Sequence, residues 1–208
     1  MNTMFTTLLA AAAAKKPYKR RLSYIRAANN SQYINTGVIA RSGLKTEIKF
    51  AINATSTVNN EILSAFNGTN RFFAPSAYNG QLQFGYGSAA TIGSLGAYSV
   101  GIDYTVFCDF TVGSQSMSIN GTTVYTGTNA SAFDTNLPLF IMLRNQQGTP
   151  RTTAAALATV YYARIWDEND ALLFDGIPVL DWDDVSCMYD NVTKALFYNI
   201  GTGTFSYA

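Results

Sequence analysis

Residues 44–52 read LKTEIKFAI and alternate in character from one position to the next, and this pattern constrains the fold more than any other feature of the chain. One set is Leu44, Thr46, Ile48, Phe50 and Ile52, and the charged set between them is Lys45, Glu47 and Lys49. Successive side chains of a β-strand point to opposite faces, so a period of two predicts a strand with one buried face and one solvent-exposed face. No segment between residues 40 and 208 has a helical period long enough to predict a major helix.

The same alternation returns later in the chain. Leu82, Phe84 and Tyr86 alternate with Gln81 and Gln83, and Val106, Cys108, Phe110 and Val112 share one side of another segment. Asn120-Gly121 stands between two alternating runs and predicts a hairpin, because a type I′ turn needs positive φ at both central residues. A second hairpin is predicted at residues 164–175, and residues 137–143 are apolar on both faces, which predicts an inner strand. Together these elements predict a two-layer, all-β sandwich.

The length and composition fit one β domain. The chain has 208 residues, of which 48% are apolar and 13% charged. This composition excludes a disordered chain. The apolar run near the N-terminus is shorter than the roughly 20 residues that a membrane-spanning helix needs. We therefore expect a single folded domain without a membrane span.

The charges are distributed unevenly. Six of the 14 basic residues and none of the 13 acidic ones lie in the first 26 positions, so this segment carries +6 and the remainder −5. Eight of the acidic residues fall within residues 167–190. A basic segment on an acidic body indicates contact with something acidic, or docking onto a larger assembly.

Histidine is absent, which removes the usual proton shuttle and the commonest transition-metal ligand. Catalysis would have to depend on carboxylates, Tyr, Lys or Cys. Cys108 and Cys187 are far apart and lack metal-ligand spacing, so we expect two buried thiols, with a disulfide as the alternative.

Residues 1–22 are predicted to form an N-terminal arm, and residues 23–208 the sandwich. A short helix is expected in the arm, because a run of alanines follows a possible N-cap and Pro17 would end the helix. Its apolar face would need cover, either from a partner or from its own domain. A secretory signal would place its charge before the apolar run, whereas here the lysines follow it. The predicted anchor residues are Phe5, Leu8, Leu9, Lys15, Lys16, Lys19, Arg20 and Arg21.

Four segments resemble, in order and approximate spacing, concanavalin A-like (laminin G-like) jelly-roll domains. They are residues 23–38, 79–87, 161–179 and 187–205. The similarity is to domains of bacteriophage tail, fibre and other structural proteins and of gut-bacterial surface proteins. The last segment, CMYDNVTKALFYNIGTGTF, follows the common pattern Y-D-x-V-T-G-K-F-Y-x-N-x-G-T-G-x-F, except that Lys194-Ala195-Leu196 stands where Gly-Lys is usual.

The resemblance implies a two-layer antiparallel jelly-roll sandwich with a short N-terminal helix or arm. In such domains the first and last strands lie side by side, so residues 23–37 are expected to pair near residues 203–208. Glycosidases on this fold carry alternate acids in an E-x-D-x-x-E strand, and this motif is missing here. We therefore expect a protein without enzymatic activity.

Acidic residues late in the chain are candidate calcium ligands, because calcium prefers oxygen donors. The candidate metal ligands are Asp181, Asp183 and Asp184, with Asp175 or Asp190 assisting. A solvated acidic loop is the favoured interpretation, since no regular ligand spacing appears. The same acids could also meet the basic arm of a neighbouring subunit. We therefore expect no metal and no cofactor, with calcium as the alternative.

Sugar binding needs exposed aromatic faces beside amide or carboxylate groups. The candidate glycan contacts are Tyr78, Tyr86, Trp166 and Trp182. Most of the 13 Tyr, 13 Phe and 2 Trp residues must instead fill the core of a sandwich this size. The basic arm could attract phosphates, but no motif indicates a specific nucleic-acid partner.

These observations lead to two hypotheses for function. The first is a virion structural protein, a bacteriophage head-decoration, fibre or tail-associated component that docks on capsid or tail proteins through its arm. Such a protein would form homo-oligomers and adhere weakly to host-surface glycans. The alternative is a secreted or surface carbohydrate-binding module of a gut bacterium, located outside the cell.

Overall fold

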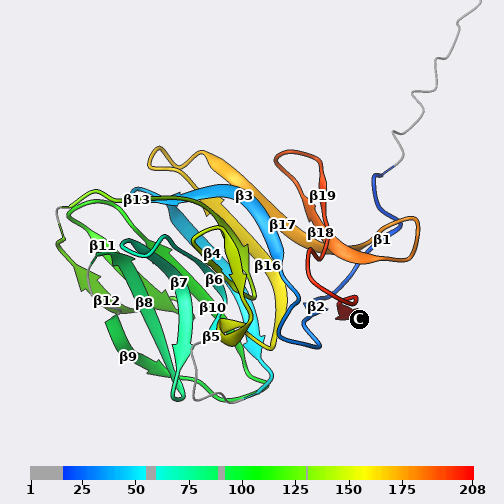
Figure 1. Ribbon diagram of the computed structural model, residues 1–208, viewed down its shortest axis with the longest axis horizontal. Coiled ribbons are helices and arrows are strands. Elements are labelled where there is room, and N and C mark those ends of the chain that lie inside the picture. Colours follow the sequence, from blue (N-terminus) through cyan, green and yellow to red (C-terminus); the bar gives the residue numbers. More distant parts are fainter. Residues whose placement is uncertain (1–15, 55–59, 89–91, 130) are drawn as a thin grey trace, which may run out of the picture.

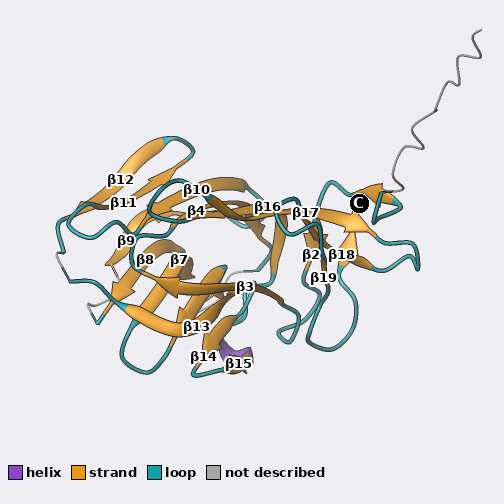
Figure 2. Ribbon diagram, turned by 90° about the horizontal axis from the view of Figure 1, so that it is seen from above, coloured by secondary structure: helices purple, strands orange, loops and turns teal. Residues whose placement is uncertain are grey.

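The computed structural model of the chain describes residues 16–54, 60–88, 92–129 and 131–208. Two β-sheets are stacked face to face in two layers, as Figure 2 shows. The expected all-β jelly-roll sandwich is therefore confirmed. The helix predicted near the N-terminus lies outside the described residues. Nowhere in the described ranges does a helix reach the length and apolar character that crossing a membrane demands.

The larger of the two sheets is here called sheet A. Its main order is β12 (Thr122–Gly127), β11 (Gln115–Ile119), β10 (Asp103–Asp109), β4 (Lys45–Ile52), β16 (Ala158–Trp166), β17 (Leu172–Leu180), β18 (Ser186–Asp190) and β19 (Leu196–Phe197). Three short strands complete it: β1 (Arg20–Arg21) pairs with β17, and β2 (Ile25–Arg26) pairs with β16 and with β20 (Ser206–Tyr207).

The second sheet, sheet B, faces sheet A across the core. Its main order is β15 (Thr149–Arg151), β14 (Arg144–Gln146), β6 (Leu63–Phe66), β7 (Arg71–Tyr78), β8 (Gln81–Gly87) and β9 (Ile92–Ala97). In addition, β13 (Asp134–Ile141) pairs with β3 (Ile34–Arg41) and with β6, and β5 (Asn60–Glu61) pairs with β7. A single 3-10 turn, η1 (Thr152–Ala154), follows β15.

The core between the sheets is built from the inward-facing side chains of both. Phe50, Phe72, Phe84, Phe110 and Phe174 are fully buried there. Phe72 from sheet B stacks on Phe110, which follows β10 of sheet A, with ring centroids 3.7 Å apart. The aromatic content of the chain therefore serves mainly to fill the space between the layers.

The alternating segments form the strands expected of them. The inward-facing residues of β4, β8 and β10 are buried, and Asn120-Gly121 forms the β11–β12 turn with φ of 50° and 81°. Residues 164–175 form the β16–β17 hairpin, and the apolar segment after residue 137 supplies β13, which lies between β3 and β6. Val112 departs from the prediction: it is 41% exposed, because β10 ends at Asp109 and Val112 lies in the following turn.

The two ends of the described chain meet in sheet A, as expected. Ile25 of β2 pairs with Tyr207 of β20, and Phe205 is buried in the core. Figure 1 shows the C-terminus beside β1 and β2. The C-terminal segment thus closes the sandwich against the start of the domain.

After β13 the chain turns and rejoins sheet B as the β14–β15 hairpin, an excursion that adds two strands beside β6. The chain turns at Met142, where φ is 71°, and continues into β14, which pairs in parallel with β6. A small apolar cluster of Tyr33, Phe140, Leu143 and Ala155 holds the excursion in place. Figure 2 shows β14 and β15 below β13, at the opposite side of the molecule from β4 and β10 of sheet A.

Candidate functional site

The four predicted glycan-contact residues lie in separate places. Tyr78 is 38% exposed at the end of β7, and Trp182 is 49% exposed in the β17–β18 turn. Trp166 is the last residue of β16 and pairs with Leu172, at the end of β17 that is far from Trp182. Its ring centroid is 6.4 Å from that of Phe107. The structure therefore does not gather these rings into one stacking surface.

Tyr86 differs from the other three because it is buried. It is 5% exposed, packs on Phe84, and its hydroxyl lies 2.8 Å from the Tyr125 hydroxyl. Burial and this hydrogen bond raise the pKa of Tyr125 to about 12. Tyr86 is therefore mainly a core residue, and too little of its ring is exposed for a sugar to stack on it.

The three candidate metal ligands form a turn. Asp181 Oδ1 accepts hydrogen bonds from the backbone N–H groups of Asp183 (3.0 Å) and Val185 (2.7 Å), and Tyr198 donates its hydroxyl to Asp181 Oδ2 at 2.9 Å. Asp183 and Asp184 are exposed. Among the residues that the structure describes, no three Asp, Glu, Cys or His side chains converge on a possible metal position. Calcium binding here stays a prediction.

Part of the basic N-terminal segment packs on the acidic turn of the same chain. Lys19 Nζ lies 2.6 Å from Asp184 Oδ1, and Trp182 Nε1 donates to the Lys16 carbonyl at 3.1 Å. Arg20–Arg21 form strand β1 at the edge of β17. Phe5, Leu8, Leu9 and Lys15 lie outside the described residues. In this structure one of the acids, Asp184, therefore pairs with a cation of its own chain.

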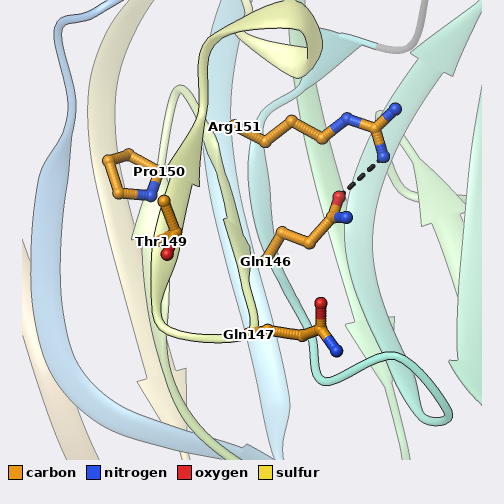
Figure 3. A pocket seen from close by; sticks show the side chains of 5 residues that line it. All are labelled: Gln146, Gln147, Thr149, Pro150 and Arg151. Carbon is orange, nitrogen blue, oxygen red and sulfur yellow. Dashed lines mark hydrogen bonds between the residues drawn. The ribbon is translucent and has the colours of Figure 1, made fainter.

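A pocket of about 490 Å³ opens on the β14–β15 hairpin. Its lining residues are Gln146, Gln147, Thr149, Pro150 and Arg151. Figure 3 shows the Gln146, Gln147 and Arg151 side chains extending from the same side of the hairpin. The pocket therefore combines two amides, a hydroxyl and a guanidinium, which are groups that orient a polar ligand.

The hairpin geometry follows from its turn. Gln147 and Gly148 have φ of 54° and 84°, as a two-residue type I′ turn requires. Gly148 N–H donates to Asn145 Oδ1 at 3.1 Å, and Gln147 N–H donates to the Phe66 carbonyl at 2.8 Å. These bonds fix the turn to the end of β6, and with it the positions of the polar side chains.

Arg151 is held within the pocket by neutral oxygens. Its Nη1 donates to Gln146 Oε1 at 2.6 Å, and its Nε donates to Thr153 Oγ1 at 3.1 Å. The two bonds restrict a long side chain that would otherwise sample many rotamers. The guanidinium is thus positioned before any ligand arrives.

An ion pair lies buried under the same hairpin. Arg144 Nη2 donates to Glu61 Oε1, and the Arg144 guanidinium lies 4.8 Å from the centroid of the Phe73 ring. Burial raises the pKa of Glu61, and the nearby charges of Arg144 and Arg151 act against that rise. Glu61 Oε2 and Arg144 Nε have no partner among the described residues. The pair supports the hairpin from below and itself faces no solvent.

A second, smaller hollow of about 230 Å³ lies near the end of β8. Its lining residues are Asn70, Tyr86, Gly87, Ser88, Asn129, Ser131, Ala132 and Phe133. No charged side chain is among these described residues. The pocket on the β14–β15 hairpin is therefore the stronger candidate, because it alone of the two contains an ionised donor.

The sequence did not identify the hairpin pocket. Residues 146–151 contain none of the aromatic or acidic residues that were sought as sugar or metal contacts. One signal was present: Arg144 directly follows a run of residues that are apolar on both faces, and a charge in such a position needs a partner.

Comparison with known proteins supports the fold. No protein-family model and no curated protein sequence matches the chain. Among solved structures, a proposed carbohydrate-binding protein from Bacteroides ovatus has a TM-score of 0.62 at 12% identity, with 91% of this chain and 60% of that chain covered. Domains LG4-5 of the mouse laminin α1 chain have a TM-score of 0.53 at 14% identity, with 78% and 45% covered. The chain thus has the expected concanavalin A-like, laminin G-like jelly-roll fold, and it spans 60% of the length of the Bacteroides protein.

Proposed function

We propose that this chain is a carbohydrate-binding domain and that its saccharide site is the pocket on the β14–β15 hairpin. The carrying observation is the pocket itself, whose lining residues Gln146, Gln147, Thr149 and Arg151 all carry hydrogen-bonding side chains. Saccharides are recognised mainly through their hydroxyl groups, and amide and hydroxyl side chains both donate to and accept from them. The likeness in fold to a proposed carbohydrate-binding protein is in keeping with this proposal.

Binding without hydrolysis fits the groups near the pocket. Most glycosidases need a pair of carboxyl groups, one on each side of the scissile bond. No carboxylate is among the described residues that line the pocket, and Glu61 beneath it is buried and paired with Arg144. A single enclosed carboxylate cannot fill both roles, so we assign the site to recognition alone.

This proposal suits a protein on a cell surface or in the extracellular space, because glycans are accessible there. The virion hypothesis depends on the N-terminal arm, and residues 1–15 lie outside the described ranges. Attachment to a capsid or tail, and assembly into homo-oligomers, stay predictions. The glycan-binding role does not depend on either.

A glycan array followed by calorimetry on the full chain tests the proposal. We expect binding to at least one class of oligosaccharide, and we expect Gln147→Ala combined with Thr149→Ala to weaken it about 30-fold, since each lost hydrogen bond is worth about 1 kcal/mol. Thr123→Ala is the matched control, because Thr123 is an exposed strand threonine on sheet A. Binding that is unchanged in the double variant, or absent from every glycan tested, would refute the proposal.

A further inference from the structure

Arg151 has neutral partners, whereas half of the other described cations have acidic ones. Six described cations form ion pairs with carboxylates: Lys19, Arg41, Lys45, Lys49, Arg144 and Arg164. Arg151 instead donates to the neutral oxygens of Gln146 and Thr153 and forms no ion pair with a described residue. Its charge is therefore held in place without being neutralised.

The guanidinium keeps donors for a ligand. Arginine carries five N–H donors in a planar fork. The described residues accept one from Nε and one from Nη1, which leaves donors on both terminal nitrogens. Two parallel N–H groups match the two oxygens of a carboxylate, and this bidentate pairing is stronger and more directional than a bond to a neutral hydroxyl.

The Glu61 carboxylate is near enough for its charge to act on Arg151, but the Arg151 hydrogen bonds of the described residues go to Gln146 and Thr153 instead. The described residues that line the pocket include no acid, and the Glu61 carboxylate beneath it is already engaged by Arg144. The Glu61–Arg144 pair is together neutral, so Arg151 determines the charge of the pocket. An anionic ligand would therefore enter a site with one uncompensated positive charge.

The pocket also lacks what a neutral sugar commonly uses. Neither an aromatic ring nor a carboxylate is among its described lining residues, so a neutral pyranose would find no stacking face and no charged acceptor for its hydroxyls. Its hydrogen bonds to Gln147 and Thr149 would contribute only about 1 kcal/mol each, because they replace bonds to water. A carboxylate gains more, because the bond to Arg151 is charge-assisted.

We propose that the pocket takes saccharides with a carboxylate, such as uronic-acid units, and that Arg151 is the residue that selects them. The proposal rests on the glycan-binding function proposed above. Gln146 is the positioning residue for Arg151, and Gln147 and Thr149 remain for the sugar hydroxyls.

The test compares a glucuronate-terminated oligosaccharide with its carboxyl-reduced, glucose-terminated counterpart by titration calorimetry. We expect the wild-type chain to bind the acidic form about 10- to 100-fold more tightly, the range that one charge-assisted contact provides. Arg151→Gln should remove this preference while leaving the affinity for the neutral form within about threefold. Arg151→Lys should restore only part of the preference, since an ammonium cannot form the bidentate pair. Lys194→Gln is the control for loss of one exposed charge, because Lys194 lies in the turn between β18 and β19 and is remote from the pocket in the fold.

The outcomes separate the two proposals. Equal affinity of the wild-type chain for both oligosaccharides would overturn the carboxylate inference and leave glycan binding standing. An unchanged preference in a folded Arg151→Gln variant would overturn the role of Arg151. A sulfated counterpart that binds as tightly as the uronate would also overturn the inference, because the site would then select charge alone. Absence of binding to any glycan would refute the proposed function itself. The comparison of the two oligosaccharides on the wild-type chain decides the ligand class even if an Arg151 variant fails to fold.

Discussion

Arg144 donates to Glu61 across 83 positions of sequence, and the β14–β15 hairpin buries the pair so that 7% of the arginine side chain and none of the glutamate side chain is exposed. The pair connects β14, which carries Arg144, to β5, which carries Glu61. It lies beneath the β14–β15 hairpin that forms the candidate pocket.

Arg144→Met should lower the free energy of unfolding by about 3–5 kcal/mol, because Glu61 would be left buried without its partner. The double variant Arg144→Met with Glu61→Leu should recover most of the loss, since two apolar side chains leave no charge to desolvate. Urea denaturation of both variants measures this. An Arg144→Met protein as stable as the wild type would show that the pair is open to water.

Asp190 should make stability depend on pH in the acidic range. Its Oδ1 accepts from the backbone N–H groups of Asp175 (2.8 Å) and Val192 (3.1 Å), and its Oδ2 accepts from the Thr193 hydroxyl at 2.6 Å. Burial alone would raise the pKa of Asp190, but the hydrogen bonds outweigh burial and hold the pKa below its usual value. The resulting stability is present above the unfolded-state pKa of about 3.9 and is lost as the pH falls through the lower, folded-state pKa.

Asp190→Asn should therefore cost about 1–3 kcal/mol at pH 7, and the difference from the wild type should shrink as the pH falls below about 4. Urea denaturation at pH 7 and pH 3 provides the measurement. Asp183→Asn, at an exposed position, is the control and should change stability by less than about 0.5 kcal/mol. A difference for Asp190→Asn that is constant with pH would contradict the account.

Removal of residues 2–21 should lower the free energy of unfolding by about 2–3 kcal/mol. Removal of residues 2–15 should not lower it, because the contacts of residues 16–21 with the domain remain. The longer deletion removes β1, the Tyr18 ring that lies 5.0 Å from that of Tyr189, and the Lys19–Asp184 pair. It also uncovers the edge of β17 near Leu180, which accepts from Lys19 N–H at 2.8 Å. Thermal unfolding of the two truncated chains distinguishes the cases, and equal melting temperatures would mean that β1 contributes nothing.

Gly201→Ala should cost about 3 kcal/mol or more, because a Cβ at this position would lie 1.5 Å from the Ser31 carbonyl oxygen. The loop after β19 would have to move away from the start of the domain. Gly121→Ala is the matched control: its φ is +81° and no atom lies within 4 Å, so only backbone strain of about 1–2 kcal/mol applies. If the two variants were equally stable, close contact at Gly201 would be ruled out as the cause.

Much of the fold could be predicted because the relevant signals are local. The alternation in residues 44–52 and the Asn120-Gly121 turn act on neighbouring positions of the backbone, and both appear in the structure as expected. The pairing of Ile25 with Tyr207 was also expected, although it followed from the resemblance to jelly-roll domains.

The exposure of individual aromatic rings could not be predicted. Tyr78 and Tyr86 both lie in strands of sheet B, yet one is 38% exposed and the other 5%. The difference arises from what packs on each ring: Tyr86 points between the sheets and meets Tyr125 from the other layer, whereas Tyr78 lies at a strand end. A periodic pattern defines two faces of a strand but does not say what covers either face.

The sequence by itself determined the strands, the tight turns and the all-β class, since these depend on side-chain period and backbone conformation over a few residues. Only the tertiary structure decided where the candidate site lies. It placed β14 in parallel beside β6, brought Glu61 under Arg144, and left Arg151 with neutral partners at an open pocket. Contacts of this kind depend on the packing of segments that are distant in sequence, and no local pattern encodes them.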